Sequence, residues 1–323
     1  MKTIKINFAG FWKGFDKEKN FITDVLKDRY NIEISDNPDY AFFMPLDAPF
    51  VCTKYDCVRI LINGEPYSSN FNAYDYIVGF DDISFQDRYF NYPFCFWSKG
   101  ERVRKGLSRE EALSVLKNKE YFCNLICSHP DGIREEIFKK LGEYKRVENP
   151  GKYLNNMDGY TVSYGDEKLN FVKKCKFTIC SEGLNYPGFI TEKITDAFKS
   201  FSIPIYVGSS NIGKFFNEKS FIDANGKTFD EILEIVKRYD SDDELYLQTL
   251  MENPLAEENL DLKYKEKFKN FLFNILDQEP EKAFRRIREY QAKWQEGFEK
   301  EYRGFYGGFV YKVLKKLHII KKK

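Results

Sequence analysis

The sequence predicts an α/β protein made of two Rossmann-like domains that face a central cleft. The chain has 323 residues, which is long for one core and suits two domains of about 150 residues each. Short apolar strands alternate with amphipathic helices, the pattern of parallel sheets with crossover helices. A polar segment with glycine and proline, NPGKYLNNMDG at 149–159, lies between two halves of similar pattern. We therefore expect domains over 1–155 and 156–290, followed by a tail over 291–323.

The first domain begins with an apolar strand over 3–11. A helix is expected over 17–27, because its apolar residues recur on one helical face. Four short strands are expected next, at 32–34, 40–44, 58–62 and 76–79. They are followed by a helix over 109–117, a strand over 122–127 and a second helix over 132–141.

The second domain starts near Gly159 with a helix over 165–173 and a strand over 177–180. A Pro-Gly turn then leads into the sequence TEK, where Thr191 is a plausible N-cap for the next helix. The apolar IPIYVG that follows predicts another strand. Three further helices are expected at 229–238, from Asp243 and from Asn259.

Composition excludes several classes of protein. The net charge is +1, so no global field recruits nucleic acid, and an anion site must be local. Seven cysteines without a C-x-x-C pair, mostly in apolar runs, indicate buried thiols in a reducing compartment. The first residues lack the pattern of a signal peptide, and no apolar run reaches the length of a membrane span. A cytoplasmic protein is expected.

The TEK segment places an acid and a base together in the first turn of a helix. That turn offers unpaired N–H groups and the positive end of the dipole, an arrangement that binds anions. Lys193 is unfavourable there for the helix itself, which indicates a strongly negative ligand, and Glu192 could bind a ribose diol. An ordinary capped helix with solvated charges explains the same residues. The glycine fingerprints G-x-G-x-x-G and Walker A are absent from the sequence.

Several segments, in the same order, resemble the α1,3/4-fucosyltransferases of glycosyltransferase family 10. The donor-side segments that carry the resemblance are CSEGLNYPGFITEKITDAF, IPIYVGSSNIGKFFNEKSFID and CNLICSHPDGIREEIFKKL. FAGFWKGFDKEKNFITDVLKDRYNIEISDNPDYAFF and INGEPYSSNFNAYDYIVGFDDISFQDRYFNYP resemble the amino-terminal and acceptor-side parts of bacterial members. The similarity covers most of the chain from Lys2 to about Leu276.

The resemblance implies a GT-B fold, with the acceptor domain first and the GDP-fucose domain second. It also implies an inverting single displacement without a metal ion or other cofactor. Glu192 and Lys193 match the ribose-binding acid and the phosphate-binding lysine of the family, and Arg134 matches its phosphate-binding arginine. Glu65, in INGEP, matches the acid taken as the general base. A loop carboxylate that caps a turn is the other interpretation of Glu65.

Two positions depart from the family pattern beside the donor. Ser181-Glu182-Gly183 stands where Phe-Glu-Asn is common, so Glu182 and Gly183 are expected donor contacts without the asparagine. Phe189, another expected donor contact, replaces a frequent tyrosine. Both departures leave the identity of the donor sugar open.

A possible metal motif and several aromatic residues allow further predictions. Asp240-Ser241-Asp242 matches the D-x-D metal motif, but it follows a helix, so we expect a helix cap and turn and no metal site. Phe11, Trp12 and Tyr67 lie near the ends of first-domain strands and are candidates to stack on acceptor sugars.

The tail beyond Glu301 has no acid, and Phe309, Val313, Leu317 and Ile320 form one helical stripe among lysines. Peripheral contact with an anionic membrane, on the cytoplasmic face of the inner membrane, is one interpretation. A frayed basic tail or an oligomer contact is another.

The sequence therefore predicts an α-1,3-fucosyltransferase that uses GDP-fucose and a GlcNAc-type hydroxyl of an oligosaccharide or lipid-linked surface glycan such as lipopolysaccharide. A transferase of another GDP-linked sugar, and a non-catalytic protein that binds nucleotide sugars or glycans, are the alternatives.

Overall fold

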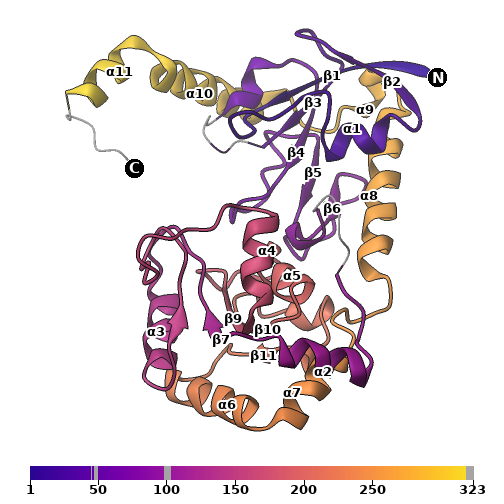
Figure 1. The fold of residues 1–323 in the computed structure, drawn as a ribbon. Helices are drawn as coiled ribbons and strands as arrows, with labels where there is room; N and C mark the ends of the chain where they lie inside the picture. The colour runs from indigo at the N-terminus through magenta and orange to yellow at the C-terminus, as the bar shows by residue number, and fades with distance from the viewer. Residues whose placement is uncertain (45, 47–49, 98–102, 318–323) are drawn as a thin grey trace. The chain divides into compact units, whose positions relative to one another are not determined.

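The computed structural model describes residues 1–44, 46, 50–97 and 103–317. The chain divides into two compact units (Figure 1). The first comprises Met1–Tyr92 with Glu266–Lys323, and the second comprises Pro93–Lys265. Each unit contains one sheet in which the paired strands run parallel, as the alternation of strands and helices predicts.

The division of the chain differs from the expected boundary at 155. Strand β7 (Tyr121–Asn124) pairs with β8 (Val147–Glu148) and with β9 (Cys175–Ser181), so the second sheet begins well before that boundary. The polar segment at 149–159 is a hydrogen-bonded loop of the second unit. Asn149 is buried there, donates to the Tyr153 carbonyl over 2.9 Å and accepts from Gly151 N over 2.8 Å. The segment at 149–159 is therefore polar because its side chains form hydrogen bonds within the loop.

The first sheet has the order β2-β1-β3-β4-β5-β6. Its middle strands are buried along their whole length, as expected for parallel strands covered on both faces. Helix α1 (Phe21–Leu26) connects β1 to β2 and begins with a capping box at Asn20. The strands are β1 (Lys2–Ala9), β2 (Tyr30–Ile34), β3 (Tyr40–Phe43), β4 (Val58–Ile62), β5 (Tyr76–Gly79) and β6 (Tyr89–Asn91).

Within the first sheet, the connections between β2 and β6 contain no α-helix among the described residues. The link from β3 to β4 carries only the 3-10 turn Val51–Lys54, and another 3-10 turn, Phe94–Phe96, follows β6. The first unit is therefore completed by helices from the C-terminal part of the chain. These are the later part of α8 (Leu260–Leu276), then α9 (Pro280–Ala283), α10 (Tyr290–Gly307) and α11 (Phe309–Lys316).

The expected separate tail over 291–323 is wrong for its α10 part. Glu296 of α10 forms an ion pair of 2.7 Å with Arg59 of β4, whose side chain is only 2% exposed. Just before α10, the buried Arg286 pairs with the buried Asp75. These contacts make the segment through α10 part of the first unit. Among the helices that the structure describes, none is both long and apolar enough to cross a bilayer.

The second sheet has the order β11-β10-β9-β7-β8, with β10 at Ile203–Val207 and β11 at Ile222–Asp223. Helices α4 (Asp166–Lys173) and α5 (Glu192–Lys199) lie against one face of this sheet (Figure 1). The other face carries one core cluster, formed with α2 (Arg109–Lys117), α3 (Gly132–Gly142), α6 (Phe229–Ser241) and α7 (Asp243–Met251). Two 3-10 turns, Ile212–Lys214 and Glu218–Ser220, lie between β10 and β11.

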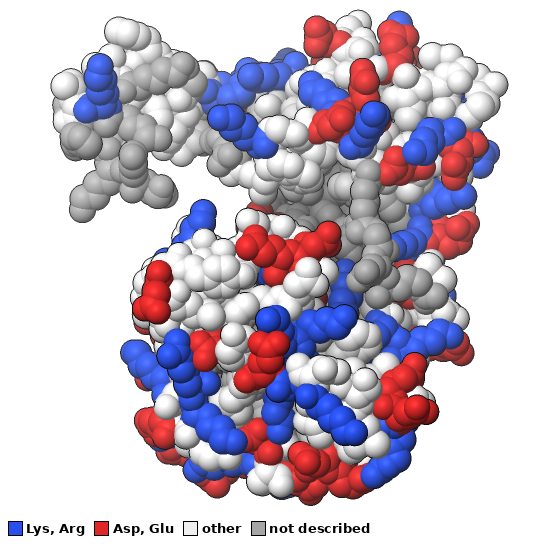
Figure 2. Space-filling view, in the orientation of Figure 1, with Lys and Arg blue, Asp and Glu red and all other residues white. Residues whose placement is uncertain are grey.

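All seven cysteines are free and buried, which confirms the prediction of buried thiols. Burial raises the pKa of these thiols, for example that of Cys57 to about 12, so they stay protonated near neutral pH. On the surface, Lys and Arg side chains are intermixed with Asp and Glu over the face drawn in Figure 2.

Candidate active site

Helix α5 begins as the TEK sequence predicts. Thr191 is its N-cap, and its hydroxyl accepts a hydrogen bond of 3.5 Å from Lys193 N. Glu192 and Lys193 therefore lie in the first turn, where free N–H groups and the helix dipole favour anions. The neighbouring strand β9 ends at Ser181, so the start of α5 lies at the carboxyl edge of the second sheet. Ligands of open α/β folds bind at this edge.

Glu182, the residue after β9, is buried and fully engaged. Its side chain is 0% exposed. One carboxylate oxygen accepts from Thr191 N over 2.8 Å, and the other accepts from Thr191 Oγ1 over 2.8 Å and from Lys193 Nζ over 2.9 Å. We expected Glu182 to contact the donor, but in this structure its carboxylate faces the start of α5.

Lys193 keeps its charge although it is largely enclosed. Burial alone would lower the pKa of its ammonium group, but the carboxylates of Glu182 and Glu192 outweigh burial and raise that pKa. The Nζ atom also donates to Thr191 Oγ1 over 3.0 Å. The side chain is 30% exposed, so a charged ammonium group is fixed beside the helix start and is still reachable from solvent.

Glu192 lies among groups that favour its ionised form. Burial raises the pKa of its carboxyl, whereas Lys193, Lys168 and a hydrogen bond from Tyr164 lower it, and the net shift is downward. Lys168 Nζ lies 4.0 Å from Glu192 Oε1. The carboxylate is therefore ionised at neutral pH and able to accept hydrogen bonds from a diol.

Tyr164 is a site residue that the sequence analysis missed. It precedes α4 and is 75% exposed, yet its hydroxyl hydrogen-bonds Glu192. Desolvation, followed by the charge of Glu192 and the hydrogen bond to it, raises the pKa of Tyr164. Lys168 Nζ lies 5.1 Å from the centre of its ring. No local pattern marks Tyr164, because its partner lies 28 positions further along the chain.

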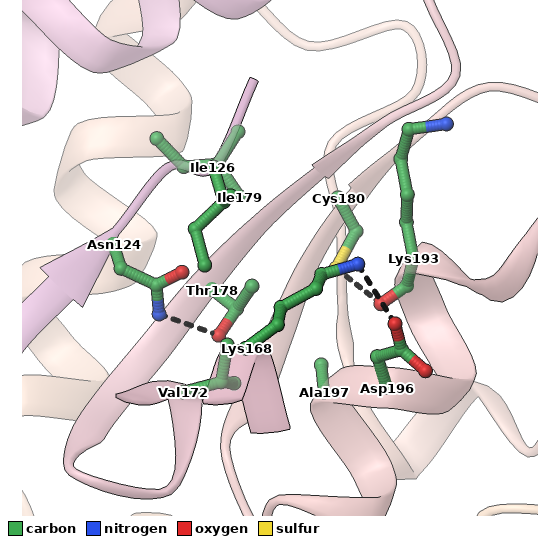
Figure 3. Close-up of a pocket in the computed structure, with 10 residues that line it drawn as sticks. All are labelled: Asn124, Ile126, Lys168, Val172, Thr178, Ile179, Cys180, Lys193, Asp196 and Ala197. Atoms are coloured by element: carbon green, nitrogen blue, oxygen red, sulfur yellow. Dashed lines mark hydrogen bonds and ion pairs between the residues drawn. The ribbon is translucent and has the colours of Figure 1, made fainter. Parts of the chain in front are cut away.

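A small pocket, open to solvent, lies between β7, β9, α4 and α5 (Figure 3). Lys168 crosses it to Asp196 over 2.7 Å, and Asn124 Nδ2 donates to Thr178 Oγ1 over 2.8 Å. Burial raises the pKa of Asp196 in spite of Lys168. The Lys193 side chain runs away from this pocket (Figure 3). The pocket and the Lys193 ammonium group therefore lie on different sides of α5.

Arg134 lies in the first turn of α3, the second helix start at this edge. Asp131 is the N-cap of α3 and also binds Arg134 Nη2 at 2.9 Å. The same Nη2 donates to the Ser181 carbonyl over 3.3 Å. Arg134 Nε is buried and has no hydrogen-bond partner among the described residues. Because buried donors are normally paired, this one indicates a missing acceptor.

Gly183 leaves room for the Arg134 side chain. Its φ of +79° suits glycine, and a Cβ atom there would lie 2.7 Å from Asp131 Oδ2 and 3.3 Å from Arg134 Nη2. The structure thus brings Arg134, Glu182, Gly183 and Lys193 together around the end of β9. Phe189, by contrast, is 7% exposed, so most of its ring is buried.

The candidate base and stacking residues lie in the first unit. Glu65 follows β4 and is exposed; its N–H donates to Asn63 Oδ1 over 3.3 Å, and its carbonyl accepts from Tyr67 N over 2.8 Å. Tyr67 packs against a core cluster, and its hydroxyl is buried without a hydrogen bond to any described residue. Burial raises its pKa. Tyr67 is therefore partly buried against the core of the first unit, and its stacking on an acceptor sugar stays a prediction.

Phe11 and Trp12 follow β1 at the same sheet edge as Glu65, because β1 and β4 both pair parallel to β3. Phe11 stacks on Phe15 with ring centres 4.2 Å apart. Trp12 meets Phe15 edge-on at 4.9 Å and is 49% exposed. Trp12 therefore offers the accessible aromatic face of this group, with Phe11 supporting it.

The D-x-D sequence is a helix cap and turn, as predicted. Asp242 is the N-cap of α7, and its side chain accepts from Leu245 N over 3.0 Å. Asp240, near the end of α6, pairs with Lys145 and Lys176, which hold the pKa of its carboxyl down against the effect of burial. Both carboxylates are committed to protein partners.

Comparison with known proteins gives two family matches. Residues 6–97 match the alpha-(1,3)-fucosyltransferase FucT N-terminal domain, and residues 115–251 match the C-terminal domain of glycosyltransferase family 10 (fucosyltransferase). The chain is 32% identical over 293 residues to an alpha-(1,3)-fucosyltransferase FucT of Helicobacter pylori, covering 78% of this chain. It spans 60% of the length of that relative.

Two similar crystal structures are those of an alpha1,3-fucosyltransferase alone and with GDP-fucose. The first has a TM-score of 0.72 and 28% identity, and the second has 0.69 and 27%. Each comparison covers 86% of this chain and 91% of the other. The two parallel-sheet units are those of the GT-B fold. The chain belongs to the glycosyltransferase family 10 fucosyltransferases.

Proposed function

We propose that this chain transfers L-fucose from GDP-fucose to a hydroxyl of a glycan, with inversion at the anomeric carbon. One observation carries the donor half of this proposal. Two cationic side chains, Arg134 and Lys193, extend from the starts of two helices to the end of one strand, where they bind the consecutive residues Ser181 and Glu182. The unpaired Arg134 Nε adds a buried donor at the same place. A pyrophosphate supplies the acceptors that such donors require.

The remaining donor contacts follow from chemistry. Glu192, held ionised by its neighbours, accepts hydrogen bonds from the two hydroxyls of the ribose. These bonds replace the one that the Tyr164 hydroxyl donates to it. As GDP leaves, negative charge grows on its phosphates, and Arg134, Lys193 and the two helix starts stabilise that charge. We propose that these groups suffice without a metal ion.

On the acceptor side, Glu65 is the proposed general base. An acceptor hydroxyl is a weak nucleophile near neutral pH and needs a carboxylate within hydrogen-bonding reach. Glu65 is exposed in the loop after β4, and Trp12 follows β1 at the same edge. Trp12 can stack on the apolar face of a sugar ring while Glu65 takes the proton. We propose a GlcNAc-type hydroxyl of an oligosaccharide or lipid-linked surface glycan as the acceptor.

We also propose a cytoplasmic reaction with peripheral membrane contact through α11. Seven unpaired cysteines suit a reducing compartment. Phe309 at the start of α11 is 81% exposed, and the sequence around it is rich in lysine and free of acids. These features favour anionic lipid as a binding surface.

Calorimetry with GDP in EDTA tests the donor site. We expect wild-type binding without metal, a loss in Lys193→Ala, and wild-type affinity in Lys139→Ala, which removes an exposed lysine of α3 paired with Glu136. Binding that vanishes in EDTA and returns with manganese would contradict the metal-free proposal. Unchanged affinity in Lys193→Ala would contradict the assignment of the site.

The donor sugar has a second candidate, because Gly183 and Phe189 depart from the family pattern next to the site. A transferase of another GDP-linked sugar would share every phosphate and ribose contact described above. Hydrolysis and transfer measured over a panel of GDP-linked sugars separate the two candidates. A protein that binds these compounds and turns over none of them would be a binding protein.

A further inference from the structure

We propose that Glu182 is a positioning residue that acts through Lys193 and does not contact the donor. Its buried carboxylate holds the Lys193 ammonium group in the place where the pyrophosphate of the donor meets it. This inference rests on the proposed donor role of Lys193. It assigns Glu182 a different part from the donor contact that the sequence suggested.

Contacts with two elements, the end of β10 and the start of α5, hold Glu182 in place. Its N–H donates to the Val207 carbonyl at the end of β10 over 3.0 Å. Its carboxylate binds the N-cap of α5 through Thr191 N and Oγ1, both at 2.8 Å. On its remaining side lies Gly208, where a Cβ atom would come within 2.7 Å of Glu182 Cγ. The carboxylate therefore has one available position.

Lys193 depends on this fixed partner. A lysine side chain has a long flexible stem and a compact charge, so it needs an anchor to hold one geometry. Of the described carboxylates, Glu182 is the one whose oxygen lies 2.9 Å from Lys193 Nζ. A buried carboxylate requires a cation and full hydrogen bonding in return, and the Lys193 contact supplies the cation. The Glu182 carboxylate thus stabilises the charged form of Lys193.

The three consecutive residues 181–183 position both cationic side chains of the site. The Ser181 carbonyl binds Arg134, Glu182 binds Lys193, and Gly183 gives the Arg134–Asp131 pair its space.

A double-mutant cycle on GDP affinity tests the inference, because it isolates action through one partner. The variants are Glu182→Gln, Lys193→Met and the two combined, measured by calorimetry in the full-length chain. We expect Glu182→Gln to weaken GDP binding about 10- to 100-fold, the range for one lost charge-assisted hydrogen bond. In the Lys193→Met background the same substitution should cost nothing further.

Asp240→Asn is the matched control. Asp240 is a carboxylate with a 3% exposed side chain that pairs with lysines in the same unit. Its partner Lys176 lies near the start of β9, the end opposite Glu182. Its loss should lower the thermal stability and leave GDP affinity unchanged. Lower GDP affinity in Glu182→Gln without a matching effect in Asp240→Asn separates positioning from general destabilisation.

The pH dependence of GDP binding gives a second readout. Lys193 is faced by Glu182 from β9, by Glu192 on its own helix and by Arg134 from α3. Removing the Glu182 charge leaves burial less opposed, so the ammonium group should lose its proton at lower pH. The alkaline loss of GDP affinity should therefore begin at lower pH in Glu182→Gln than in the wild type.

The outcomes are distinct. Equal losses in both backgrounds would show direct donor contact and overturn the inference, as would tighter GDP binding in Glu182→Gln, which would mean that Glu182 competes with the phosphates. Wild-type affinity in Lys193→Met would instead refute the proposed donor role of Lys193. If Glu182→Gln does not fold, Glu182→Asp serves, because it keeps the charge and sets it one methylene short of Lys193. It should then weaken binding only when Lys193 is present.

Discussion

Glu182 and Glu192 lie near each other but meet different surroundings. Both oxygens of Glu182 are taken by Thr191 and Lys193, so the carboxylate is structural in its contacts. Glu192 has the hydroxyl of Tyr164 and the ammonium groups of Lys168 and Lys193 near it, and a ligand can replace the hydroxyl. Side-chain partners therefore decide which of two neighbouring acids is available to a substrate.

Glu65 gives the sharpest prediction for a single residue. Glu65→Gln keeps the shape and the hydrogen-bonding reach of the side chain but cannot accept a proton. If Glu65 is the base, transfer should fall by at least about 100-fold, the usual scale for a lost general base. GDP affinity should stay unchanged, because the residues proposed to bind GDP belong to the second unit.

Turnover and GDP affinity measured on one preparation of Glu65→Gln decide the matter. The other interpretation, a carboxylate that caps a turn, predicts lower thermal stability with little kinetic effect. Wild-type turnover in the variant would exclude Glu65 as the base.

Single residues could be predicted from the sequence where the signal is local. The N-cap role of Thr191 and that of Asp242 follow from the residue type and the next few positions, and the structure confirms both. Tyr164 could not be found in this way, because it meets Glu192 only after β9 and two helices have folded. The packing of Tyr67 against a core cluster could not be found in this way either, since the cluster is built from other segments.

For whole elements, helices with strong caps were predicted best. The helix over 109–117 has the predicted bounds and begins with a capping box at Ser108. The expected helix over 17–27 is shorter, starting at Phe21, because Asn20 forms the capping box there. The short strands β6 and β11 were missed, since two or three residues carry too little periodicity to detect.

The segment between α9 and α10 allows a test of how the C-terminal helices hold the first unit. Asp75 is buried and accepts from Arg285 N, Arg286 N and the Arg286 guanidinium group. Asp75→Asn leaves a buried cation without its counter-charge, so we expect the free energy of unfolding to fall by about 3 to 5 kcal/mol. Chemical denaturation followed by circular dichroism measures this loss.

Asp87→Asn is the matched control for this substitution. Asp87 pairs with Arg285, next along the chain, but its side chain is 53% exposed. An exposed pair contributes about 0 to 1 kcal/mol. Equal losses in the two variants would contradict the structural role given to the buried pair.

Helix α11 is expected to govern membrane binding and to be dispensable for catalysis. Phe309 and Leu317 are 81% and 62% exposed, and Ile320 of the predicted stripe lies outside the described residues. A chain that ends before Phe309 keeps Glu296 and its ion pair with Arg59. Binding to anionic liposomes should be lost, while turnover of a soluble acceptor stays near the wild-type value.

Sedimentation with liposomes of anionic and of neutral lipid measures the effect of this truncation. The full-length chain on neutral liposomes is the control, because lysines on an acid-free helix require anionic lipid. Unchanged binding after truncation, or loss of the fold, would contradict the prediction.

At the scale of the whole molecule, the fold class was predictable and the division of the chain was not. Alternating strands and helices indicate two parallel sheets wherever the boundary falls. The boundary depends on pairings between distant residues, such as Asp75 with Arg286, 211 positions apart. Such contacts make residues 266–323 part of the first unit. A composition shift at 149–159 could not reveal them, because it marks a loop and not a linker.

This division predicts that the fragment Pro93–Lys265 folds alone and binds GDP. The main core cluster of the second unit, from Ala112 to Leu250, lies wholly inside it. Tyr264, in the part of α8 that remains, still packs on Phe96 and Phe215, with ring centres 5.5 and 6.0 Å apart. The proposed donor residues are all present. We therefore expect cooperative unfolding, measured by circular dichroism, and a GDP affinity in EDTA close to that of the full chain.

The fragment Met1–Tyr92 is the converse and should not fold. It contains Asp75 and the buried Arg59 but lacks both of their partners, Arg286 and Glu296. Lys193→Ala in the Pro93–Lys265 fragment is the control for specific binding, since it should fold and lose GDP affinity. A folded fragment that binds no GDP would mean that the first unit supplies essential donor contacts. If the Pro93–Lys265 fragment does not fold, the prediction that the second unit folds alone is wrong. The core of that unit would then depend on residues outside 93–265.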